Sequence, residues 1–176
     1  MKNLLFLFTT LLALISCSKD DNKPTNPTDQ LPPATQIGAN TAGCLLDGKA
    51  FLPKGYLPTG NLVCYYIDGK DFTISLAQKL NNQTILIGII SNSQSLVIGQ
   101  TYILKEYGAN SQFGEYNIYQ DIGDLRYKTT STITGELKIT NHNFDKAILS
   151  GTFWFDAINS EGGKIQVREG RFDMEY

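Results

Sequence analysis

The sequence predicts an all-β domain, and three observations lead to that prediction. Asp-Gly pairs stand between short apolar runs, apolar and polar residues alternate along several later segments, and no stretch keeps a helical period. About nine antiparallel strands with short connections are expected. They would form a single β-sandwich or a meandering barrel, and both arrangements fit the pattern.

The chain divides by composition into three parts. Residues 1–16 hold a short apolar run after Lys2, residues 17–42 are rich in Pro, Thr, Asn and Asp, and residues 43–176 carry the strand patterns. The apolar run is shorter than the roughly 20 residues that a membrane-spanning helix needs, and its length is typical of a signal peptide. The middle part has few large apolar residues, which predicts a disordered, flexible linker.

The signal segment ends in Leu14-Ile15-Ser16-Cys17, which resembles the lipobox of bacterial lipoproteins. In those proteins the signal is cut before the cysteine, which then carries the acyl chains. The resemblance implies that Cys17 is lipidated and anchors the protein in a membrane, with the outer membrane as the expected location. Ser18-Lys19-Asp20-Asp21 resembles the acidic export tag of Bacteroidetes surface lipoproteins and implies exposure at the cell surface. If these residues are only linker, the domain faces the periplasm.

Two similar units predict tight hairpins. LLDGKAF (45–51) and YIDGKDF (66–72) each place Asp-Gly between apolar residues. Asp and Gly tolerate the positive φ angles of a type I′ turn, so the turns are expected at Asp47-Gly48 and Asp68-Gly69.

The last hairpin is marked by strict alternation. Apolar or small residues at 149, 151, 153 and 155 face one way, and the chain returns with Ile165 and Val167. The alternation changes phase before Phe172, and a β-bulge near Glu169-Gly170 would restore it.

Two segments resemble small Bacteroidetes lipoproteins of an uncharacterised domain family. They are GCLLDGKAFLP, which begins at Gly43, and GTFWFDAINSEGGKIQVREGRFD, which begins at Gly151. The resemblance covers most of residues 31–176. Its motifs are turns, strand faces and a cysteine, so it implies a fold and no particular activity.

Charge and cysteine content narrow the classes of partner. Removing residues 1–16 removes one Lys and leaves 14 basic against 17 acidic residues, a net charge of −3. A chain with this net charge has no excess of basic residues with which to bind nucleic acid. Cys44 and Cys64 form an even pair in an oxidising compartment, which predicts one disulfide; the alternative is two buried free thiols. No CxxC or Cys-His spacing indicates a metal or another cofactor.

The sequence contains no recognisable catalytic motif, and we expect no enzymatic activity. His142 is the one histidine, it lies in a segment that reads as a polar turn, and no GxSxG motif accompanies it. A pair of carboxylates could serve a hydrolase, but no spacing shows that two of them converge. The candidates are Asp121, Asp124, Glu136, Asp156 and Glu169.

The leading hypothesis is a non-catalytic binding module for a glycan or a surface protein. Tyr65, Tyr119 and Trp154 lie on strand faces among polar neighbours and are candidates for a contact surface, because aromatic rings offer rigid apolar area with a polar tip. The alternative is that they only pack the sheet. A small barrel that carries an apolar ligand and a carboxylate-dependent hydrolase are the two further hypotheses.

Overall fold

The computed structural model describes residues 26–176, and these form one sheet of 11 strands that folds over on itself. The all-β prediction is confirmed, with more strands than the nine expected. One pairing between strands, of Leu104 with Gln112, is parallel, as is the isolated bridge between Lys54 and Gln78. The predicted signal peptide, Cys17 and Ser18–Asp21 lie outside the described residues.

One 3-10 turn precedes the strands. It is η1 (Pro27–Gln30), and no helix of the described residues is long and apolar enough to span a bilayer. The strands are β1 (Thr41–Leu46), β2 (Lys49–Phe51), β3 (Leu62–Ile67), β4 (Asp71–Leu80), β5 (Gln83–Ser91), β6 (Thr101–Leu104), β7 (Gln112–Gln120), β8 (Leu125–Lys128), β9 (Gly135–Asn143), β10 (Ile148–Ile158) and β11 (Lys164–Glu175).

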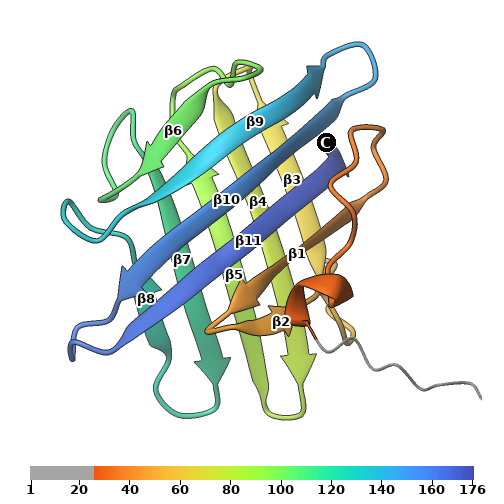
Figure 1. The fold of residues 1–176 in the computed structure, drawn as a ribbon. Coiled ribbons are helices and arrows are strands. Elements are labelled where there is room, and N and C mark those ends of the chain that lie inside the picture. The colour runs from red at the N-terminus through yellow and green to blue at the C-terminus, as the bar shows by residue number, and fades with distance from the viewer. Residues whose placement is uncertain (1–25) are drawn as a thin grey trace, which may run out of the picture.

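The strands form two layers that belong to one continuous sheet. Their order is β2-β1-β11-β10-β9-β6-β7-β5-β4-β3, with β8 alongside β7 and β10. In Figure 1, β9, β10, β11 and β1 form a front layer that crosses obliquely over β7, β5, β4 and β3. Lys54, just after β2, bridges to Gln78 of β4, so the segment that follows the first strand of the sheet order pairs with the next-to-last strand. The arrangement is therefore intermediate between a sandwich and a barrel.

Apolar side chains from both layers fill the space between them. Phe72 of β4 stacks on Phe172 of β11 with ring centroids 5.7 Å apart, which joins the two layers directly. The largest fully buried apolar side chains come from six of the strands and are Phe72, Ile74, Leu76, Ile87, Ile89, Leu104, Leu137, Ile139, Leu149, Phe155 and Val167. The alternation seen in the sequence is thus the alternation between core and solvent.

Both predicted Asp-Gly turns are formed. Asp47 and Gly48 have φ angles of 47° and 77°, and Asp68 and Gly69 have 52° and 67°. Positive φ at both central positions is what a type I′ turn requires. The first turn connects β1 to β2, and the second connects β3 to β4.

The predicted β-bulge is also present, and it lies in the middle of the front layer. Phe153 pairs with Gly170 whereas Phe155 pairs with Val167, so β11 has one more residue here than β10. Glu169 takes the positive φ of 53°. A Cβ on Gly170 would come within 2.5 Å of the Phe153 ring, so glycine is needed where that ring crosses β11.

The predicted boundary between linker and domain is wrong in part. Residues 26–40, expected to be linker, pack onto the domain: Leu31 is buried, and the carboxylate of Asp173 binds the segment at Thr35–Ala39. The Asp173 oxygens accept hydrogen bonds from the Thr35 hydroxyl at 2.6 Å and from the Ile37, Gly38 and Ala39 amides at 2.9–3.1 Å. The segment has too few apolar residues for its sequence to show that it is folded. It is held by the carboxylate of Asp173, which lies far away in the chain.

Candidate functional site

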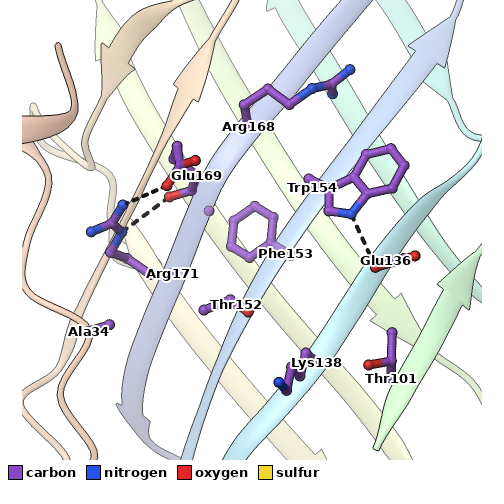
Figure 2. A pocket seen from close by; sticks show the side chains of 11 residues that line it. Ala34, Thr101, Glu136, Lys138, Thr152, Phe153, Trp154, Arg168, Glu169 and Arg171 are labelled. Atoms are coloured by element: carbon purple, nitrogen blue, oxygen red, sulfur yellow. Dashed lines mark hydrogen bonds and ion pairs between the residues drawn. The ribbon is translucent and has the colours of Figure 1, made fainter. Parts of the chain in front are cut away.

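A groove lies on the outer face of the front layer, over β9, β10 and β11. Its volume is about 760 Å³. Figure 2 shows the lining side chains, with Ala34 of the N-terminal segment on one side and Thr101 of β6 on the other. Besides two threonines, the polar lining side chains are Glu136, Lys138, Trp154, Arg168, Glu169 and Arg171. We call this hollow the main groove.

A row of three side chains lies across one end of the groove. Trp154 of β10 pairs with Glu136 of β9, and its indole Nε1–H donates to the Glu136 carboxylate at 3.3 Å. From β11, the guanidinium carbon of Arg168 lies 5.3 Å from the centroid of the Trp154 ring. A cation over an indole face contributes about 0.5–1 kcal/mol at an exposed site. We call Glu136, Trp154 and Arg168 the central row.

The central row is held in a fixed geometry. Arg168 forms an ion pair with Asp156 at 2.6 Å and donates to the carbonyls of Phe155 at 3.1 Å and Val167 at 2.9 Å. The guanidinium therefore has little freedom to turn away from the indole. Trp154 is held by Glu136 and Arg168 while 36% of the residue stays exposed.

A second ion pair of the groove, between Glu169 and Arg171, lies beside the bulge. Because β11 carries an extra residue at Glu169, the adjacent residues Arg168 and Glu169 both reach the outer face. There Glu169 forms an ion pair with Arg171 at 3.3 Å. Lys138, on the opposite side of the groove, makes no ion pair or side-chain hydrogen bond with any described residue. Counting only partners among residues 26–176, the groove thus presents one free cation, one fixed aromatic ring and several hydrogen-bonding groups.

The structure separates the three aromatic residues that the sequence singled out. Trp154 lines the main groove, while Tyr65 lies on β3 and Tyr119 on β7, both in the other layer. Tyr119 has the Arg126 guanidinium 6.0 Å from its ring centroid. The three side chains therefore do not form one surface.

Two of the five candidate acids share the main groove. Glu136 and Glu169 both line it, and Asp156 lies just beyond the central row. Asp124 pairs with Arg126, and Asp121 lines a polar hollow at the tips of the β4–β5 and β7–β8 connections. No three His, Cys, Asp or Glu side chains within residues 26–176 are grouped so that they could hold a metal ion.

Sequence reasoning missed the cations of the groove. Arg168, Arg171 and Lys138 stand at outward positions of β11 and β9, so the alternation that located Trp154 also marks them as facing solvent. The alternation pattern does not give the strand register, and only the register shows that Glu136 and Arg168 flank the indole.

The polar turn predicted at 141–146 starts later than expected: residues 144–147 form the turn, and His142 still belongs to β9. β9 continues through Asn143, and His142 is only 6% exposed. Its Nδ1 lies 3.1 Å from the Leu96 carbonyl and its Nε2 3.1 Å from the Tyr176 hydroxyl, and its ring stacks on Phe144. Burial lowers the pKa of His142, although the hydrogen bond to Leu96 acts in the opposite direction. His142 of β9 thus contacts two distant segments of the chain, at Leu96 and at Tyr176.

The predicted disulfide is not formed in the structure. Cys44 lies on β1 and Cys64 on β3, strands that are not hydrogen-bonded neighbours, and both are buried free thiols. Burial raises the pKa of each thiol to about 12. Both side chains act as small apolar groups of the core.

Fold and groove together define an all-β domain with an open, mixed aromatic and charged groove on one sheet face. The chain belongs to a family of domains of unknown function (DUF6252), whose family model matches residues 65–174. This confirms the expectation of an uncharacterised domain family. The matched region contains every lining residue of the main groove except Ala34. Comparisons with curated proteins and with solved structures found no match.

Proposed function

We propose that this protein is a lipid-anchored, non-catalytic binding module of the cell envelope and that it binds carbohydrate in the main groove. The observation that carries the ligand class is the central row: an exposed indole whose N–H is held by Glu136 and whose ring is flanked by Arg168. A sugar ring presents an apolar C–H face that stacks on an indole, and its hydroxyls accept from and donate to charged side chains around the ring.

The position of the groove favours a sugar over an extended peptide. β10 is hydrogen-bonded to β9 along one side and to β11 along the other. Its backbone groups are already paired, so a peptide could not bind here by adding a strand, which needs a free sheet edge. Recognition must come from side chains, and those present suit hydroxyl groups.

The two acids of the groove argue for binding ahead of hydrolysis. A glycosidase uses one carboxyl group on the leaving oxygen and a second as nucleophile or base. In the groove, Glu136 accepts from Trp154, and Glu169 is paired with Arg171. Both carboxylates are engaged in fixing neighbouring side chains. Likewise, the space where an apolar cargo would lie is filled by core side chains such as Phe72 and Phe155.

The anchoring half of the proposal comes from the sequence around Cys17. Each acyl CH₂ buried in a membrane contributes about 0.8 kcal/mol, and two or more chains hold a protein stably where one does not. The outer membrane is the expected location, with the domain at the cell surface or on the periplasmic side. Cys17→Ala should abolish metabolic labelling with a radioactive fatty acid, and undiminished label in the variant would contradict the anchor.

Intrinsic fluorescence tests the binding half directly, because Trp154 is the one tryptophan of the chain. Titrating the protein with a panel of soluble oligosaccharides should change the Trp154 emission for at least one of them. By calorimetry, Trp154→Ala should weaken that binding at least tenfold, while Tyr65→Ala, an exposed aromatic of the other layer, serves as the matched control and leaves it unchanged.

The stability of the variants decides whether Trp154 serves binding or packing. Because the indole is partly exposed, Trp154→Ala should lower the free energy of unfolding by only about 1 kcal/mol. A loss of about 3 kcal/mol or more would show that Trp154 is a structural residue. No response to any sugar would overturn the carbohydrate proposal.

A further inference from the structure

A second hollow adjoins the main groove and shares Trp154 with it. Its volume is about 310 Å³, and its lining includes Thr132, Thr134, Asp156, Lys164 and Gln166. It extends from the central row toward the β10–β11 turn, whereas the main groove extends the opposite way. We call it the side groove.

The strand register gives the direction and length of the combined surface. Lys138 of the main groove pairs with Thr152, and Lys164 of the side groove pairs with Ile158. At about 3.4 Å per residue, these two levels are roughly 20 Å apart along β10. Trp154 stands between them, so the surface is long, narrow and centred on an aromatic ring.

The charges along this surface are nearly balanced, and those left free lie in different hollows. Lys138, Lys164, Arg168 and Arg171 face Glu136, Asp156 and Glu169, a formal sum of +1. Arg168 is paired with Asp156, and Arg171 with Glu169. Within the described residues Lys138 and Lys164 make no ion pair and no side-chain hydrogen bond. Each hollow therefore keeps one lysine with three unused donors.

We infer that the ligand is a linear oligosaccharide of at least three sugars that lies along β10 and crosses Trp154. One sugar stacks on the indole, a second lies in the main groove within reach of Lys138, and a third lies in the side groove within reach of Lys164 and Gln166. A single sugar ring, only a few ångströms across, cannot contact both lysines. This inference rests on the proposed carbohydrate function and adds the length and placement of the ligand.

The test measures affinity against ligand length. The probes are β-1,4-linked oligomers of glucose, mannose, xylose and N-acetylglucosamine and α-1,4-linked oligomers of galacturonate, each from one to six sugars. Trp154 emission reports binding. For the series that binds, Kd should fall at least tenfold from the monosaccharide to the trisaccharide and by less than threefold from the tetrasaccharide to the hexasaccharide.

Variants of the side groove locate the added affinity. Lys164→Ala and Gln166→Ala should weaken trisaccharide binding at least fivefold more than they weaken monosaccharide binding. Lys70→Ala, an exposed lysine on the β3–β4 turn, is the matched control and should change neither. Urea unfolding of each variant shows whether it is folded before its affinity is compared.

The outcomes separate the two proposals. A Kd that is the same for one sugar as for six would leave carbohydrate binding standing and overturn the extended site. So would side-groove variants that weaken monosaccharide and trisaccharide binding equally. No emission change with any member of the five series would overturn the carbohydrate function and the extended site together.

Discussion

Replacing Asp173 by asparagine should destabilise the domain, because this carboxylate is the main polar link between the N-terminal segment and the sheet. Asp173 is 1% exposed, and its two oxygens accept from Thr35, Ile37, Gly38, Ala39 and Ser150 at 2.6–3.1 Å. In Asp173→Asn an NH₂ group replaces one acceptor and faces donors. At about 1.5–3 kcal/mol for a hydrogen bond to a charged group, we expect a net loss of about 3 kcal/mol.

The pH dependence of the same site gives a second estimate. Burial alone would raise the pKa of Asp173, but the hydrogen bonds from Thr35, Ile37, Gly38 and Ser150 outweigh burial and lower the pKa from 3.8 to about 2. A carboxyl whose pKa is lower in the folded state stabilises that state above the unfolded pKa. Here the effect is about 2 kcal/mol at neutral pH, and it is lost as the pH falls from about 4 to 2.

Urea unfolding of the wild type and of Asp173→Asn at several pH values measures both effects. At pH 7 the variant should unfold at a urea concentration about 1–2 M lower. At pH 2.5 the difference between the two proteins should shrink by about 1.5 kcal/mol, because the wild type has lost most of the carboxylate's contribution. Asp121→Asn, at an exposed acid, is the matched control. Equal midpoints at pH 7, or a gap that does not change with pH, would refute the reasoning.

Two further predictions concern His142 and the cysteines. As the one histidine of the chain, His142 gives a single imidazole signal in an NMR titration, and because burial lowers its pKa the midpoint should lie below 6.5. Stability from this group is then complete above pH 6.5 and falls as the pH drops through the lowered value; a midpoint at or above 6.5 would contradict the buried, neutral ring. In a Cys17→Ala protein that has not been reduced, Cys44 and Cys64 should resist alkylation while folded and both react in urea, because burial raises the pKa of each thiol to about 12. Two thiols that stay unreactive in urea would instead reveal a disulfide.

Features encoded within a few neighbouring residues were predictable. The turns need positive φ at two adjacent residues, and an Asp-Gly pair such as Asp47-Gly48 indicates such a turn from sequence alone. The bulge at Glu169 was visible because a strand that changes the phase of its alternation must either lose its core face or insert a residue. Such signals depend on local backbone preference and on the two-residue period of a strand.

Features that depend on distant partners were not predictable. The polar neighbours of His142 predict a turn, yet Leu96 and Tyr176 satisfy its nitrogens from 46 and 34 residues away. The composition of the segment at Thr35–Ala39 predicts a linker, yet Asp173 supplies acceptors for it from more than 130 residues away. In both cases the missing information was which polar group meets which.

By itself the sequence determined the all-β class, the two Asp-Gly turns, the bulge and the outward orientation of Trp154. The tertiary structure alone decided that Glu136 and Arg168 flank that indole, that two hollows meet there, and that Tyr65 and Tyr119 lie elsewhere. The physical reason is register. Alternation fixes which face a side chain takes, whereas its neighbours on that face depend on how strands far apart in the chain are paired, which is set by packing of the whole core.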